Sequence, residues 1–88
     1  MELYKSVIRR YLSEYACSLR EKRGLTQAEM AERLRITERA YSDLERGVYC
    51  FSTVPLVSLL LMVKSDEFEE FIEPLRGEIA KLEAGEVA

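Results

Sequence analysis

The side chains of this 88-residue chain that are most suited to a functional role lie between residues 26 and 46. They are suited to binding a ligand through hydrogen bonds. The guanidinium of Arg39 can donate two hydrogen bonds to the O6 and N7 acceptors of a guanine. The carboxylates of Glu38 and Asp43 can accept from the N4 amino group of a cytosine. The alternative is that these are ordinary solvated charges, with the two carboxylates pairing with Arg39 or Arg46.

Catalytic and metal chemistry find little support in the sequence. The chain contains no histidine, no paired nucleophile and base, and no glycine-rich loop that could cradle a phosphate, so an enzyme is not expected. Cys17 and Cys50 are the only cysteines, and two isolated thiols cannot supply the four ligands of a structural zinc site. We therefore expect no metal and no cofactor, and we expect both thiols to be buried or idle.

Two short helices joined by a tight turn must position the binding side chains. Thr26 can cap the first helix, because its hydroxyl can accept a backbone N–H and Glu29 stands three residues later to complete a capping box. Thr37 can begin the second helix in the same way, and Gly47 can end it. Apolar residues recur at helical spacing in both segments, namely Ala28, Met30, Ala31, Leu34, Ala40, Tyr41 and Leu44.

The turn between these helices consists of Arg35 and Ile36 only. It is too short for antiparallel helices and favours a crossing of about 90 to 120°, as in a helix-turn-helix. Residues 19–47 also resemble, without a gap, the Cro/C1-type (XRE) family of helix-turn-helix domains, through Arg20, Gly24, Leu25, Thr26, Gln27, Ala31, Leu34, Ile36, Ser42, Leu44, Glu45 and Gly47. The resemblance implies an all-α, lambda-repressor-like bundle of five helices.

The resemblance also assigns roles to individual side chains. The exposed face of the second helix would reach base edges through Thr37, Glu38, Arg39, Ser42 and Asp43. Thr26, Gln27 and Arg46 would contact phosphates, although capping alone would explain Thr26 and a free surface arginine would explain Arg46. Arg20 and Glu45 would form a structural ion pair that holds the first helix of the domain against the recognition helix.

The chain departs from the family pattern at two places. Where the family usually has glycine in the turn, this chain has Arg35, and a non-glycine residue in the left-handed region costs about 1 to 2 kcal/mol, which makes the turn a candidate for reshaping. After Gly47, where many members place basic or small polar residues against phosphate, residues 48–51 read VYCF. We therefore expect this second phosphate clamp to be missing, and the loop either to pack inward or to contact a protein partner.

A long amphipathic helix is expected at each end of the chain, and residues 1–88 are expected to form a single domain. Apolar spacing predicts one helix over residues 3–23, of which residues 1–10 extend beyond the family's own first helix. Residues 65–84 predict an amphipathic C-terminal helix with an acidic start and a kink near Pro74. These two helices either cover the domain's own core or supply a dimer surface through Tyr4, Ile8, Tyr11, Phe68, Phe71, Ile72, Leu75 and Ile79.

The helix that precedes the last one is expected to be central to the core. Ser52 or Thr53 can cap it, and Pro55 falls in its first turn, where a missing N–H costs nothing. Residues 56–63 are apolar apart from one serine, and a helix that is apolar nearly all round belongs in the interior.

Charge is divided unequally along the chain. Residues 1–63 carry ten basic and eight acidic side chains, whereas residues 64–88 carry three basic and eight acidic ones. A phosphate backbone is bound chiefly by basic groups, so this balance weakens the case for tight DNA binding by a monomer. No apolar run is long enough to cross a bilayer, and the first twelve residues mix charges into their apolar positions, so we expect a cytoplasmic protein.

The leading hypothesis is a sequence-specific DNA-binding transcriptional regulator, which binds double-stranded DNA as a homodimer and reads the major groove with the helix over residues 37–46. The alternative is a protein–protein interaction module on a helix-turn-helix scaffold, such as an antitoxin-like protein or a regulatory adaptor. The acidic side chains of Glu38 and Asp43 favour the alternative, because a carboxylate that faces phosphate is repelled.

Overall fold

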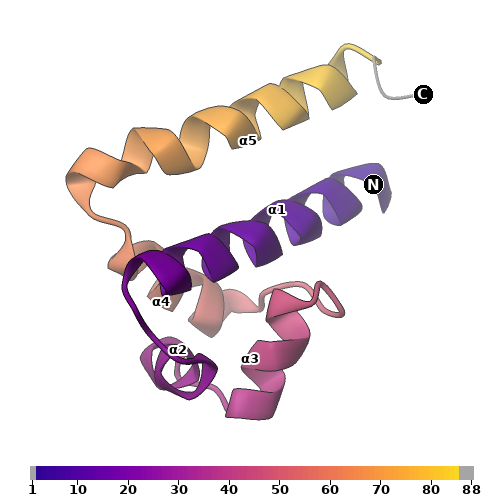
Figure 1. Ribbon diagram of the computed structural model, residues 1–88. Helices are drawn as coiled ribbons and strands as arrows, with labels where there is room; N and C mark the ends of the chain where they lie inside the picture. Colours follow the sequence, from indigo (N-terminus) through magenta and orange to yellow (C-terminus); the bar gives the residue numbers. More distant parts are fainter. Residues whose placement is uncertain (1, 86–88) are drawn as a thin grey trace.

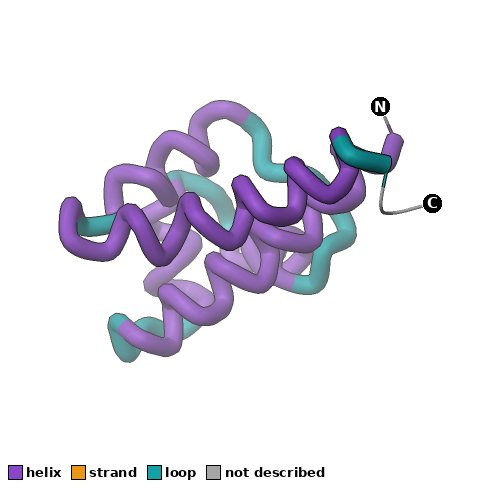
Figure 2. The backbone as a smooth tube through the Cα atoms, turned by 90° about the horizontal axis from the view of Figure 1, so that it is seen from above, coloured by secondary structure: helices purple, strands orange, loops and turns teal. Residues whose placement is uncertain are grey.

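The structure, a computed structural model, describes residues 2–85 and is all-α, as predicted. Figure 1 shows the helices, and in Figure 2 the described backbone contains only helices and loops. The elements in chain order are α1 (Glu2–Lys22), α2 (Gln27–Leu34), α3 (Glu38–Glu45), α4 (Thr53–Met62), the short 3-10 helix η1 (Ser65–Glu67) and α5 (Phe68–Glu83). Among the described residues, no helix is both long and apolar enough to cross a membrane.

The starts of α2 and α3 follow the predicted capping. The Thr26 hydroxyl accepts from the Glu29 N–H at 3.1 Å, and the Glu29 carboxylate accepts from the Thr26 N–H at 2.8 Å, which completes the capping box. The Thr37 hydroxyl accepts from the Ala40 N–H at 3.1 Å at the start of α3. Each cap satisfies backbone donors that the first helical turn leaves without a partner.

The ends of α1, α2 and α3 share one geometry. Gly24, Arg35 and Gly47 all adopt a left-handed conformation, with φ of 68°, 64° and 77°. In each case the next residue donates its N–H to a carbonyl five positions back, the Schellman arrangement that closes a helix. Arg35 therefore occupies a position that glycine fills in the other two helices, and the turn keeps its usual shape.

The side chain of Arg35 reaches from this turn to α4. One of its guanidinium nitrogens donates to the Ser58 hydroxyl at 3.1 Å and to the Arg33 carbonyl at 3.2 Å. Ser58 is buried in the face of α4 that contacts α2. This bond ties the turn to α4 and offsets part of the cost of a left-handed arginine.

The core lies where α1, α2, α3 and α4 meet, and α5 covers the other side of α1 (Figure 1). Tyr41, Met30, Leu34 and Leu59 are its largest completely buried side chains. The remaining members of the cluster are Leu12, Ala16, Leu19, Ala31, Leu44, Phe51 and Phe71. The packing holds α2 against α3 and so fixes how the two helices of the motif cross.

The prediction that α4 is central to the core is wrong. Pro55, Ser58 and Leu59 are buried, but Val54, Val57, Leu60 and Leu61 are exposed, and Leu61 keeps 76% of its surface. α4 packs mainly against α2, and its apolar side chains outside that contact stay largely exposed. The apolar sequence of a helix thus shows which side chains could be buried. The helices that pack against it determine which of them are buried.

Helix α5 runs back alongside α1 in the opposite direction (Figure 1). The Tyr11 hydroxyl donates to the Phe71 carbonyl, and the Tyr15 ring meets the Phe71 ring edge-on at 4.6 Å between centroids. The helix starts at Phe68, three residues later than predicted, because η1 occupies residues 65–67. It continues through Pro74 without interruption.

An ion-pair cluster that the sequence analysis missed joins the end of α1 to η1. Arg23 donates both terminal guanidinium nitrogens to the Glu67 carboxylate, at 3.0 and 2.6 Å, and also bonds the Met62 carbonyl at 3.0 Å. Lys22 lies 2.9 Å from the same carboxylate, and the Lys64 N–H donates to it at 3.0 Å. Hydrogen bonds from Arg23 and Lys22 hold the pKa of Glu67 well below its usual range.

Candidate nucleic-acid interface

A buried ion pair supports the face formed by α2 and α3. Arg20 of α1 donates to both oxygens of Glu45 at the end of α3, at 2.8 and 3.2 Å, in the two-point geometry that a guanidinium and a carboxylate favour. The two side chains retain only 17% and 10% of their surface. Arg20 also donates to the Leu25 carbonyl at 3.0 Å, so it fixes the loop that leads into α2. The predicted pairing of Arg20 with Glu45 is thus present.

Two further side chains complete the network around Glu45. The Tyr41 hydroxyl donates to one carboxylate oxygen at 2.5 Å, and the Gln27 amide donates to the other at 2.8 Å. Glu45 therefore joins α1, α2 and α3. This role of Tyr41 was not predicted, although Tyr41 and Glu45 stand four residues apart on one helix, the spacing at which side chains meet.

The network sets the ionisation of its members. Burial raises the pKa of Glu45, but hydrogen bonds from Arg20, Tyr41 and Gln27 outweigh this effect, so the pKa lies below its ordinary value. Burial and the bond to Glu45 raise the pKa of Tyr41. At neutral pH the site thus holds an ionised carboxylate, a guanidinium and a neutral phenol.

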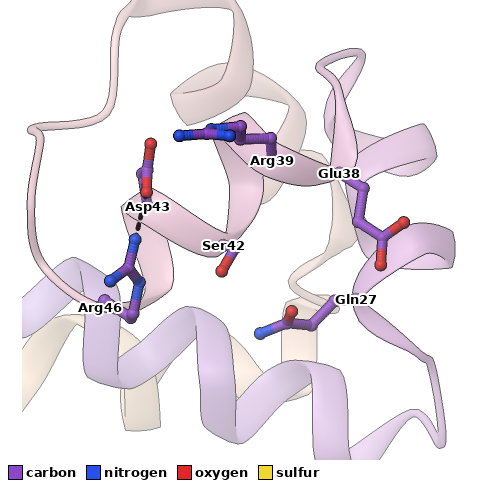
Figure 3. Close-up of a pocket in the computed structure, with 6 residues that line it drawn as sticks. All are labelled: Gln27, Glu38, Arg39, Ser42, Asp43 and Arg46. Atoms are coloured by element: carbon purple, nitrogen blue, oxygen red, sulfur yellow. Dashed lines mark hydrogen bonds and ion pairs between the residues drawn. The ribbon is translucent and has the colours of Figure 1, made fainter.

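The surface formed by α2 and α3 contains an open depression (Figure 3). It is lined by Gln27, Glu38, Arg39, Ser42, Asp43 and Arg46, which are six of the eight side chains predicted to contact DNA. Gln27 comes from the start of α2, and the other five come from α3 and its C-terminal cap. The fold therefore gathers the polar side chains of two helices on one face.

The charged side chains of this depression differ in their bonding. Arg46 donates to the Asp43 carboxylate at 2.5 Å, which is the pairing that the sequence analysis raised as the alternative to DNA contact (Figure 3). Within residues 2–85, neither Glu38 nor Arg39 takes part in an ion pair. Both are exposed, so Arg39 is the cation on this face that is most available to a ligand.

The two threonines and Gln27 already have structural partners. Thr26 and Thr37 are the N-caps of α2 and α3 and do not line the depression. Gln27 uses one of its amide N–H donors on Glu45, which turns part of its bonding capacity inward. Capping consumes the N–H groups of Thr26 and Glu29, so those of Gln27 and Ala28 remain for an anion at this helix start.

The eight residues of the predicted dimer surface divide into two groups. Phe71 is buried in the core and Tyr11 bonds its carbonyl, so these two hold α5 on α1. The other six keep part of their surface exposed, namely Tyr4, Ile8, Phe68, Ile72, Leu75 and Ile79. Three of them line an apolar depression along α5 together with Arg76 and Glu83.

The residues after Gly47 also divide, because Phe51 is buried in the core while Val48 and Tyr49 are exposed. Cys17 and Cys50 are free thiols with partial exposure, and burial raises the pKa of Cys17. Within residues 2–85, no three histidine, cysteine, aspartate or glutamate side chains are grouped so that they could hold a metal ion.

Comparison with known protein families matches residues 18–60 to a family described as helix-turn-helix. This segment contains α2, α3 and the Arg20–Glu45 pair, and most of α4. No curated protein and no solved structure matches the chain.

Proposed function

With residues 18–60 forming a Cro/C1-type helix-turn-helix domain, which supports a DNA-binding regulator, we propose that the protein reads a specific sequence in double-stranded DNA as a homodimer. In this proposal α3 enters the major groove. Its exposed side chains contact base edges, and the start of α2 contacts the phosphate backbone.

The observation that carries the proposal is the depression that α2 and α3 line together. Arg39 is exposed and free of ion pairs within the described chain, so its guanidinium can bind guanine O6 and N7 without first breaking a bond. Ser42 lies on the same surface and can donate or accept at a base edge. Thr37, at the N-cap of α3, stands at the end of the helix that enters the groove first.

The carboxylates of Glu38 and Asp43 would help this surface to discriminate between DNA sequences. Asp43 is bonded to Arg46, so the pair presents little net charge to a phosphate. Glu38 is exposed and has no such partner among the described residues. A carboxylate accepts from cytosine N4 but is repelled by the acceptors of guanine and by phosphate, so it penalises wrong sequences as well as favouring the right one.

The proposal is tested by selecting binding sites from random DNA at low and moderate salt. Arg39→Ala should weaken binding to the selected site by about 1 to 3 kcal/mol and relax the preference at one base pair. Arg33→Ala is the matched control. It removes the same charge from α2, but Arg33 lines a different depression from the one that contains Arg39. If selection at low salt enriches no sequence, the proposed function is wrong.

The homodimer is a separate part of the proposal. Two-fold symmetry would place two copies of α3 about 34 Å apart, one turn of DNA. Sedimentation equilibrium of the protein alone should report a dimer. Ile79→Asp, in the apolar depression of α5, should shift it to monomer, while Leu61→Asp on α4 should leave it dimeric. If Leu61→Asp gives a monomer and Ile79→Asp stays dimeric, the dimer contact is on α4 instead.

The second candidate function is a protein–protein interaction module. It is favoured by the exposed apolar side chains Val54, Val57, Leu60 and Leu61 of α4, and by Val48 and Tyr49, which are exposed on the loop that precedes this helix. In that case the chain should recover a protein partner that the Leu61→Asp variant fails to recover. A pull-down that yields nucleic acid and no protein would count against this candidate.

A further inference from the structure

The N-terminal extension of α1 places two arginines beside the C-terminal end of α3. A second open depression is lined by Ser6, Arg9, Arg10, Ser13, Glu14, Glu45, Arg46 and Gly47. Each of its α1 members has another member three or four residues away, one helical turn along, so they form a polar stripe on one face of that helix. Arg46 lines both this depression and the one in front of α3, so the two are contiguous.

We infer that Arg9 and Arg10 bind the phosphate backbone of DNA beside the C-terminal end of α3. The inference rests on the proposed function. α3 has eight residues and is about 12 Å long, which is close to the width of the major groove, about 12 Å. If the first residues of α3 touch bases, its last residues lie at the rim of the groove, where a phosphate strand runs.

The bonding of the two arginines leaves them able to take a phosphate. Within the described chain Arg9 takes part in no ion pair. Arg10 lies 3.5 Å from Glu78 of α5, but its side chain keeps 61% of its surface, and such an exposed pair contributes little. A phosphate can therefore replace Glu78 as the partner of Arg10.

The acidic residues of this depression do not cancel the arginines. Glu45 is neutralised by Arg20, with which it forms two hydrogen bonds. Glu14 is exposed and opposes the two arginines as a single charge. A guanidinium can bind phosphate through two parallel hydrogen bonds. Arg9 and Arg10 therefore still offer directional donors to a phosphate when Glu14 offsets part of their charge.

This arrangement supplies what the loop after Gly47 lacks. The loop carries Val48 and Tyr49 on its exposed side and Phe51 on its buried side, so it offers no basic side chain. Ser13 lies 3.6 Å from the position that a Cβ on Gly47 would take, so α1 passes directly over this turn. The first helix thus brings basic side chains beside Gly47, the residue from which this apolar loop departs.

The test is the salt dependence of binding to the DNA site selected with the unmodified chain. Each phosphate contact contributes about 0.9 to the steepness of log affinity against log salt. Arg9→Gln with Arg10→Gln removes two contacts from each protomer of the proposed homodimer, so it should make the slope less steep by about 3.6. Each single variant should make it less steep by about 1.8. The base preference should not change, because phosphate contacts carry no sequence information.

Two controls separate phosphate binding from other effects. Arg33→Gln with Lys81→Gln removes the same charge from α2 and α5, outside this depression and outside the proposed dimer contact, and should lower the slope by less than half as much. Glu78→Gln breaks the intramolecular pair of Arg10 and keeps the arginine, so it should retain the full slope. Thermal melts of all variants report whether each is folded.

The outcomes separate this inference from the proposed function. If the unmodified chain binds its site with a steep slope and the arginine variants share that slope, the inference is overturned and the proposed function stands. If Glu78→Gln loses as much slope as Arg10→Gln, Arg10 acts as a tie between α1 and α5, which also overturns the inference for that residue. If the unmodified chain binds no DNA, both fall together.

Discussion

Glu45 is the residue on which the geometry of the candidate interface depends most. It accepts two hydrogen bonds from Arg20 of α1, one from Gln27 of α2 and one from Tyr41 of α3. Glu45→Ala should lower the free energy of unfolding by about 3 to 5 kcal/mol, because it leaves a largely buried guanidinium without its carboxylate. Urea unfolding measures the loss.

Asp43→Ala is the matched control for this change. It removes a carboxylate from the same helix, but one whose partner Arg46 keeps 65% of its surface. Its cost should be about 1 kcal/mol or less. Equal losses from the two variants would mean that the buried network contributes no more than a surface pair.

Arg35 allows the strain of a left-handed residue to be measured separately from its side-chain bond. Arg35→Ala loses the bond to Ser58 and keeps the strain, whereas Arg35→Gly loses the bond and relieves the strain. The glycine variant should therefore be more stable than the alanine variant by about 1 kcal/mol, as read from urea midpoints. If the alanine variant were the more stable, the turn would have to change shape in solution.

The sequence allowed prediction of the local contacts of the site and missed those that depend on packing. The Thr26–Glu29 capping box follows from a spacing of three residues, and the Arg20–Glu45 pair follows from the family resemblance. The bond from Gln27 to Glu45 joins residues eighteen positions apart, and no local pattern indicates it. The depression beneath Arg9 and Arg10 is equally non-local, because it forms only when α1 lies over Gly47.

At the scale of the elements, Phe71 is the side chain of α5 that is most deeply buried against α1. Phe71 is 4% exposed and packs against Tyr15, while Phe68, on the same helix, is 46% exposed. Phe71→Ala should cost about 3 to 4 kcal/mol, because it leaves a cavity between the two helices. Phe68→Ala should cost about 1 kcal/mol or less in the same thermal or urea titration. Comparable losses would show that α5 is held by its whole length.

The elements themselves were predictable where short-range rules govern them. N-caps and the left-handed residues Arg35 and Gly47 define the limits of α2 and α3, and these limits agree with the prediction. The apolar pattern of α4 gave its length but did not reveal which face is buried, since that depends on the position of α2. The delayed start of α5 has a similar cause, because Arg23 of α1 binds Glu67 and stabilises η1 as a separate turn.

At the scale of the whole molecule, stability should be level near neutral pH and decrease at the acid end. The folded pKa values of Glu45 and Glu67 lie below their ordinary values, so their contributions are fully present above the unfolded pKa of about 4.3 and are lost as pH falls through the folded values. The chain has no histidine, so no imidazole titrates between pH 5 and 8. The free energy of unfolding should be level from about pH 8 to 5 and decrease below that.

Glu67→Gln tests this assignment, because it should flatten part of the acid decrease. Glu69→Gln, which changes an exposed carboxylate at the start of α5, should leave the acid decrease as it is. A profile in which stability falls between pH 8 and 6 would indicate a titrating group other than these carboxylates.

The bond between Asp43 and Arg46 has a consequence for how a regulator of this kind would search a genome. Attraction to random DNA comes from phosphate neutralisation, and it determines how long a protein remains at each wrong site. An arginine that is bonded to its own neighbour contributes less to that attraction. Under the proposed function, this pairing shortens the time that the protein spends at wrong sites and shifts its occupancy of the genome toward matching sites.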